Sequence, residues 1–514
     1  MPVEGQRRLA PETVAPSAAA GGDALAARVA AFLRDLDERP EVVEQAIAAL
    51  GEEELNHYGL RSFHLNLLAV FGERWPAARV RRAAQEATRN KLWRGWQYYA
   101  YMTHLRAGEP AAPRLLGGVP AERLRALLAG GRGLLLCACH LGDYRHIPSD
   151  LALAGLPSTT PMDADGYGQY QRTRQAIPDH PLWHHLRATN VEEPAGTLSL
   201  ARALARGEIV FAYLDGNTGT DGPLGDAGRI EIEMLGYRVR VKSGIARLAA
   251  RFGCPLVPVV VPRVGGCGRF RIGRAVAPGG RLKGPAEERF VREAMAHLYR
   301  TFERAIRAHA AQWETCCFFH RWRAGAESAP PLPAPSLEAA QREVEADLAA
   351  GRRLGMNARR IVEIRGAETI WSDARTLKAY RAPAAAPWLL DRLSPSGGGI
   401  DRQQLAERAT SSLPAALSFL ALLKARDALA VAGDGAGDAM NAAVARNDRL
   451  EPSGPAPAGG DAVVPAPAAA HHRRTRRPGG PPGGPAAGVC RIQPLQRRRS
   501  HEQSQAGPGS RAGG

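Results

Sequence analysis

The sequence contains no apolar run long enough to cross a membrane. Its most apolar stretch, Cys254–Pro262, lies between Arg251 and Arg263 and is far shorter than the roughly 20 residues that a spanning helix needs. The first 22 residues also lack the apolar segment of a signal peptide. We therefore expect a chain that is soluble or attached to a membrane surface.

Cysteine is scarce and irregularly placed. The seven cysteines, an odd number, predict reduced thiols in a cytoplasm rather than a disulfide framework. The GxxxxGK(S/T), GxSxG and HExxH motifs of P-loop NTPases, α/β hydrolases and zinc proteases are absent. A metal site is not expected either, because the spacing of the candidate ligands is not that of a zinc site; these candidates are Cys137, Cys139, Cys316, Cys317 and His320.

Acidic residues are too few to balance the basic ones, 51 against 68, which gives a formal net charge of +17. Residues 451–514 hold nine Arg against three acids and contribute +6 of this charge. The remaining excess suits an anionic partner, such as a phospholipid surface, an acidic carrier protein or a phosphorylated substrate. The Arg-rich tail could contact nucleic acid, but its low-complexity composition favours a solvated extension. We therefore do not expect nucleic acid to be a partner.

Composition and hydrophobic periodicity divide the chain into six segments. Gly-, Ala- and Pro-rich sequence predicts disorder near both ends, and the pattern between them changes from helical to mixed. The predicted segments are a disordered lead-in (1–22), an N-terminal helical region (23–110), an α/β domain (111–325), a linker (326–335), a small α+β domain (336–432) and a disordered basic tail (433–514).

Within the α/β segment, short apolar runs alternate with helical patterns. Strands that are apolar on both faces and separated by helices are typical of a mostly parallel sheet flanked by helices. The predicted strands are Leu134–Cys139, Ile209–Asp215, Leu256–Val261 and Arg269–Val276, and the predicted helices are Thr197–Arg206, Ser243–Phe252 and Pro285–Gln312.

An aromatic cluster lies near the end of the helical region. Its rings could belong to the core, or they could form an interfacial belt, because Trp and Tyr combine an apolar body with a polar tip. The cluster consists of Trp93, Trp96, Tyr98, Tyr99, Tyr101 and Met102.

The strongest functional signal is a histidine directly after the first apolar strand. Catalytic groups of open α/β sheets lie at the carboxyl ends of strands, where His140 is expected. A histidine there can act as a general base, since its pKa is near neutral, but it needs a carboxylate to orient the ring.

Four motifs in chain order make residues 25–323 resemble the lysophospholipid acyltransferase superfamily, closest to its lipid A lauroyl/myristoyl acyltransferase branch. The resemblance implies an α/β acyltransferase that moves a fatty acyl group from an acyl carrier protein or coenzyme A thioester to a hydroxyl or amine of a lipid-like acceptor. It implies no cofactor, and a place on the cytoplasmic face of the bacterial inner membrane. The motifs are His140-Leu-Gly-Asp-Tyr, similar to the HxxxxD/E motif; Asp215 at a strand end; Met234–Arg238 followed by Ser243–Ala249 and Pro255–Val261; and Ala311–Glu314 with His320–Arg323.

One position departs from the motif. The family carboxylate stands five residues after the histidine, where this chain has Arg145. We assign His140 as the base and Asp143 as the carboxylate that orients it, and Asp215 could instead reach across from a neighbouring strand. If neither does, the chain is a catalytically silent relative that binds lipid or an acyl carrier.

Several polar residues are candidates for substrate binding. The guanidinium of Arg145 suits a phosphate or carboxylate. Three basic residues alternate on one strand face and could contact the donor phosphate or an acidic carrier, or form a solvated strand edge. Asp215 could equally cap a helix or turn. The substrate-binding candidates are Arg145, Asp215, Asn217, Arg238, Arg240 and Lys242.

Residues 360–430 offer a different acceptor. A predicted hairpin, Arg360–Ile364 with Ile370–Trp371, is followed by a predicted helix, Leu413–Leu429. This arrangement faintly resembles the small PqqD-like peptide-recognition domains, which hold a leader peptide as an added strand. The acceptor would then be a peptide natural product rather than a lipid.

Overall fold

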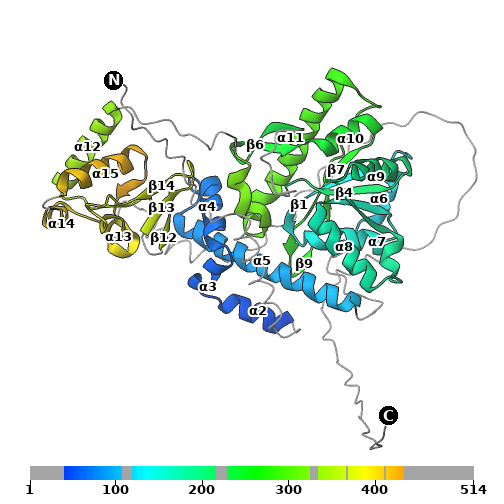
Figure 1. Cartoon of the computed structure of the whole chain (residues 1–514), viewed down its shortest axis with the longest axis horizontal. Helices are drawn as coiled ribbons and strands as arrows, with labels where there is room; N and C mark the ends of the chain where they lie inside the picture. Colours follow the sequence, from blue (N-terminus) through cyan, green and yellow to red (C-terminus); the bar gives the residue numbers. More distant parts are fainter. Residues whose placement is uncertain are drawn as a thin grey trace, which may run out of the picture.

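A six-stranded sheet with the strand order β10-β7-β1-β4-β2-β3 organises the body on the right of Figure 1. All neighbouring strands are parallel except β10, which runs antiparallel to β7. The computed structural model describes residues 40–106, 118–215, 228–324, 334–365, 369–409 and 412–432. The strands of the sheet are β1 (Leu134–Gly142), β2 (Ser158–Met162), β3 (Leu186–Asn190), β4 (Ile209–Tyr213), β7 (Leu256–Val261) and β10 (Arg271–Ile272). The predicted combination of a mostly parallel sheet with helices is confirmed.

Helices cover both faces of this sheet. Because side chains alternate along a strand, Leu134 and Leu136 of β1 share a core with Leu124 and Leu151 of the helices on one face. Their neighbours, such as Leu135, share a second core with the helices on the other face. The first face is covered by α6 (Ala121–Leu128) and α7 (Ile147–Leu153), and the second by α9 (Pro194–Ala205), α10 (Gly244–Phe252) and α11 (Gly284–Ala308).

Two parts of the sheet differ from the prediction. The expected strand Arg269–Val276 is limited to Arg271–Ile272 of β10, with one isolated bridge at Val276. Pro258 of β7 has no N–H to donate at this position, which limits further pairing. The edge region β2–β3 was not predicted, because Ser158–Met162 is rich in hydroxyl residues and contains a proline.

The helical region packs beside the sheet. Its aromatic cluster belongs largely to the interior, as Trp93, Trp96 and Tyr101 are buried, whereas Tyr99 is 47% exposed. The core interpretation therefore holds for three of the rings. In the described parts of the chain, no helix has both the length and the apolar character that crossing a membrane requires. The helices are α2 (Pro40–Ala49), α3 (Glu52–His57), α4 (Leu60–Phe71) and α5 (Ala77–Arg106).

The segment after α11 folds back across the helical region and is called here the closing segment (residues 310–324). It contains a 3-10 helix, Glu314–Arg321. The side chain of Asn90 on α5 donates to the Ala311 carbonyl at 3.0 Å, and Asn66 on α4 donates to the Cys317 carbonyl at 3.2 Å. A hairpin of β5 (Arg229–Met234) and β6 (Tyr237–Lys242) borders the same segment, because the Arg240 N–H donates to the Trp322 carbonyl at 2.8 Å.

Residues 334–432 form a C-terminal module with a core of its own around Trp371. Figure 1 shows the helical region, in blue, between this module, in yellow and orange, and the body that contains the sheet. The Arg323 guanidinium joins the module to the closing segment by donating to the Ala374 carbonyl at 2.8 Å. The module contains α12 (Ala334–Ala349), β11 (Leu354–Met356), β12 (Ile361–Arg365), β13 (Thr369–Asp373), β14 (Ala379–Arg381), α13 (Leu389–Leu393), α14 (Arg402–Arg408), α15 (Leu413–Ala425) and β15 (Leu429–Val431).

Candidate active site

His140 lies near the carboxyl end of β1, where the chain makes a sharp turn. Gly142 has a φ of +66°, and a Cβ atom at this position would lie 2.0 Å from the Val261 carbonyl oxygen of β7. Only glycine fits this combination of a left-handed backbone and a close approach. The turn thus keeps β1 and β7 in contact while it leaves the ring of His140 at the end of the sheet.

The carboxylate that contacts His140 is Asp215, which follows the neighbouring strand β4. The His140 Nδ1 atom lies 2.7 Å from Asp215 Oδ1, and the His140 backbone N–H donates to both carboxylate oxygens at 2.9 and 3.0 Å. The Asp215 side chain is fully buried, and that of His140 is 19% exposed. One acid therefore fixes both the main chain and the ring of the histidine.

The closing segment completes the environment of Asp215. Trp313 Nε1 donates to Asp215 Oδ2 at 3.2 Å, and the Thr315 hydroxyl donates to the same oxygen at 2.7 Å. These bonds replace the water that a buried carboxylate loses. Because its other partners are all donors, Asp215 accepts a hydrogen bond from Nδ1 of His140.

This tautomer leaves the other ring nitrogen of His140, Nε2, as an acceptor. Nε2 makes no hydrogen bond within the described ranges of the chain. The imidazole packs against two aromatic rings, with centroids 4.6 Å away for Tyr144 and 4.5 Å away for Tyr213. A histidine held by a carboxylate at one ring nitrogen can act as a general base through the other.

Arg145, at the position of the family carboxylate, is held by an acid from the closing segment. Arg145 Nη2 lies 2.7 Å from Glu314 Oε1, and Arg94 of α5 binds the other oxygen, Oε2, at 3.0 Å. Burial opposes ionisation of Glu314, but the charges of Arg145 and Arg94 hold the pKa of this carboxyl well below its usual range. The group is therefore a permanently charged Arg–Glu–Arg cluster.

Asp143, predicted to be the orienting carboxylate, makes no hydrogen bond to His140 among the described residues. Asp143 is buried, and its Oδ2 atom has no hydrogen-bond partner among the described residues. Burial raises the pKa of Asp143 to about 6, against the opposing charges of Arg263 and Arg94. The acid that contacts His140 is Asp215, the alternative carboxylate from the neighbouring strand.

The remaining candidates are not joined to this centre. Arg238 and Arg240 of β6 form exposed ion pairs with Glu231 of β5, at 3.7 and 3.6 Å. Lys242 lies at the end of the same strand, and burial and Arg229 lower its pKa. These residues border the closing segment without contacting His140. Asn217 lies outside the described residues.

Sequence reasoning missed the roles of the closing segment. Trp313, Glu314 and Thr315 contact Asp215 or Arg145, yet they follow these residues by about 100 positions or more. The available signal was the motif Ala311–Glu314, whose Trp-Glu pair was recognised as a resemblance but was given no function.

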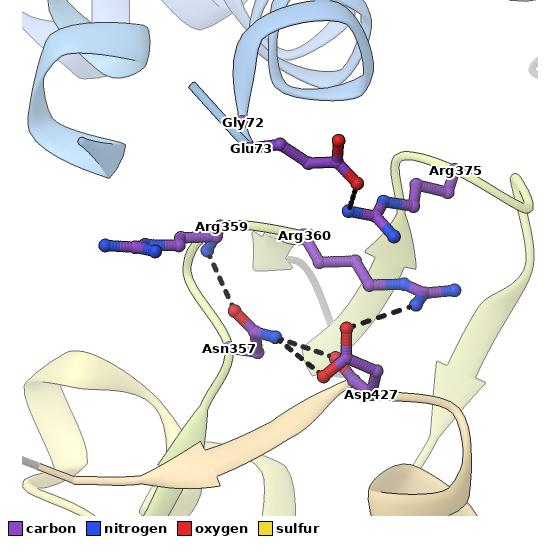
Figure 2. Close-up of a pocket in the computed structure, with 7 residues that line it drawn as sticks. All are labelled: Gly72, Glu73, Asn357, Arg359, Arg360, Arg375 and Asp427. Atoms are coloured by element: carbon purple, nitrogen blue, oxygen red, sulfur yellow. Dashed lines mark hydrogen bonds and ion pairs between the residues drawn. The ribbon is translucent and has the colours of Figure 1, made fainter. Parts of the chain in front are cut away.

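A pocket lies elsewhere, at the junction of α4 and the C-terminal module (Figure 2). It has a volume of about 300 Å³. Two ion pairs line it, as Arg375 binds Glu73 and Arg360 binds Asp427. The pocket is therefore a polar junction between two parts of the molecule, and it does not include His140.

The six cysteines among the described residues are buried. Cys137 and Cys139 face the α11 side of β1, and burial raises the pKa of both thiols. Burial likewise raises the pKa of Cys317 to about 11. Within the ranges that the structure describes, no three side chains of the metal-binding types converge.

No protein-family model matches the chain, and no curated protein matches it in sequence. The resemblance to acyltransferases therefore remains a proposal.

Proposed function

We propose that the chain is an acyltransferase in which Asp215 orients His140 as the general base. The observation that carries this proposal is the 2.7 Å contact between His140 Nδ1 and Asp215 Oδ1, at the ends of two adjacent parallel strands. Asp215 thus supplies the carboxylate that the resembling motif has at position 145, where this chain has Arg145.

In the proposed reaction, His140 Nε2 accepts the proton of an acceptor hydroxyl or amine. The acceptor oxygen or nitrogen attacks the thioester carbonyl and forms a tetrahedral intermediate. As this intermediate collapses, the carbon–sulfur bond breaks and the imidazolium returns its proton to the thiolate. Asp215 stabilises the imidazolium throughout. No cofactor is needed.

The proposed donor is an acyl carrier protein or coenzyme A thioester, and the proposed acceptor is a lipid. The net charge of +17 supports attachment to an anionic membrane surface and to an acidic carrier. Arg238, 70% exposed, and Arg240 are available for such contacts at the cost of weak surface ion pairs with Glu231.

The test is acyl transfer from radiolabelled acyl carrier protein and acyl-coenzyme A into a mixed lipid extract. We expect product from the wild type and a loss of roughly 10²–10⁴-fold in His140→Ala. His297→Ala is the matched control, since the hydrogen bond of its ring within the described residues goes to the Arg274 carbonyl on an exposed face. Product that persists in His140→Ala would exclude the proposed base. Absence of transfer by the wild type, together with tight binding of acyl carrier protein, would identify a silent relative.

A further inference from the structure

Arg145 is held at two of its three guanidinium nitrogens. Nη2 donates to Glu314 Oε1 at 2.7 Å, and Nε donates to the Tyr144 hydroxyl at 3.1 Å. The guanidinium carbon also lies 5.8 Å from the ring of Tyr98. The third nitrogen, Nη1, makes no hydrogen bond to a residue that the structure describes, and a third of the side chain is exposed. One donor edge of Arg145 is thus both fixed and open.

Glu314 is itself held in place by Arg94. Arg94 Nε binds its second oxygen at 3.0 Å, and Arg94 Nη1 donates to the Gln312 carbonyl at 3.3 Å. Arg94 is only 4% exposed, so it cannot move outward to meet a ligand. Two arginines share one carboxylate, and the cluster keeps one positive charge in excess. That charge is presented at Arg145, its accessible end.

The cluster lies beside the proposed base. Tyr144, which binds Arg145, has its ring edge-on to the imidazole of His140, with the centroids 4.6 Å apart. Glu314 also stands between Trp313 and Thr315, the two residues that donate to Asp215. One short segment therefore fixes the acid of the base on one side and the cation on the other.

We propose that Glu314 is a positioning residue, which holds Arg145 so that its open edge binds an anionic group of the substrate next to His140. The inference rests on the proposed function, because it assumes that the anionic group belongs to the acyl donor or acceptor. The chemistry recognised is a phosphate or carboxylate, because the fork of a guanidinium matches both. A purely structural ion cluster would leave binding of anions unchanged once the protein is folded.

The experiment compares acceptors and donors that carry phosphate with counterparts that carry none. The acceptor arm uses monoacylglycerol against lysophosphatidate, and the donor arm uses acyl-coenzyme A against the acyl thioester of N-acetylcysteamine. We expect Glu314→Gln to raise KM for the phosphorylated member of one arm roughly tenfold, with a smaller change in kcat. The arm that responds identifies which substrate carries the anion. Equal losses with phosphorylated and neutral partners would overturn the inference.

Two further variants separate positioning from general damage. Glu303→Gln removes a similar glutamate partner from Arg307 on α11 and is expected to leave both arms unchanged. Arg145→Gln should give the same selective rise in KM, and the double variant should add nothing to it, because both changes remove one clamp. Additive losses would contradict the inference.

A binding measurement keeps the inference independent of turnover. Lysophosphatidate and a non-hydrolysable thioether analogue of acyl-coenzyme A are titrated calorimetrically into folded wild type and Glu314→Gln. Weaker binding of either ligand to the variant, without transfer by the wild type, would refute the proposed function and retain the anion site. Transfer by the wild type, with both ligands bound equally by the two proteins, would refute the anion site alone.

Discussion

Two buried carboxylates near the end of β1, Asp215 after the neighbouring strand and Asp143 in the turn, lie in opposite environments. Asp215 and Asp143 are 1% and 2% exposed. Asp215 accepts hydrogen bonds from His140, Trp313 and Thr315. One oxygen of Asp143 has no donor among the described residues. A buried charge is tolerated when protein donors replace water, so the number of donors distinguishes the acid suited to catalysis from the acid that is only buried.

The burial of Asp143 determines how the stability of the folded state changes with pH. Burial raises the pKa of Asp143 in the folded chain to about 6, above the value of about 3.9 for an unfolded aspartate. The folded state therefore binds more protons between these values, and its stability falls as pH rises from about 4 to about 6. Above about pH 6 the ionised carboxylate of Asp143 destabilises the folded state.

The largest expected contrast is in activity. Asp215→Asn should lower kcat/KM for acyl transfer by roughly 10²–10⁴-fold, because the ring of His140 loses the charge that orients and stabilises it. Asp143→Asn should change the rate by less than about threefold. Steady-state assays of both variants measure the contrast, and equal losses would return Asp143 to the site.

The second contrast is in stability at pH 7.5. Asp215→Asn should lower the free energy of unfolding by about 2–4 kcal/mol, since an amide presents a donor where the site offers only donors. Urea denaturation followed by tryptophan fluorescence measures the change. An unchanged midpoint would mean that Trp313 and Thr315 do not bind this carboxylate in solution.

The third contrast is a substitution that should stabilise the folded state. Asp143→Asn should raise the free energy of unfolding by about 1–3 kcal/mol at pH 7.5, because it removes a buried charge with an unpaired oxygen. The gain should disappear below about pH 4, where the wild-type carboxyl is protonated in both states. Paired urea titrations at the two pH values test it, and a gain that is independent of pH would point to packing instead of charge.

The smallest expected effect comes from removing one hydrogen-bond donor to Asp215. Thr315→Val keeps the shape of the side chain and removes one 2.7 Å hydrogen bond to Asp215. We expect a loss of about 1–2 kcal/mol in the free energy of unfolding. Thr301→Val, whose hydroxyl donates to a helix carbonyl on α11, is the matched control and should lose less. Equal losses would show that the carboxylate gains nothing special from Thr315.

The central strands were predictable because their signal is local. Leu256–Val261 is apolar at every position, and its predicted bounds match β7. Ser158–Met162 escaped prediction, because its three hydroxyl residues and Pro161 resemble a loop. Their burial depends on neighbours in the sheet that no short window of sequence contains.

The site was predictable only in part for the same reason. His140 follows an apolar strand, so its place at the end of the sheet could be inferred. Its acid stands 75 residues away, and proximity in sequence favoured Asp143 instead. The left-handed turn at Gly142 redirects the chain, and the Asp143 N–H binds the Val261 carbonyl at 3.0 Å. A change of direction in one residue thus separates sequence neighbours.

The late position of the closing segment has a consequence for synthesis. The ribosome delivers His140 and Asp215 well before Trp313 and Thr315, so a growing chain holds the base and its acid without the two side-chain donors that complete the site. We expect nascent chains that end before residue 310 to be inactive even when their sheet has formed. The chain would then become active only late in translation. Activity assays of stalled chains of increasing length would locate the residue at which activity begins.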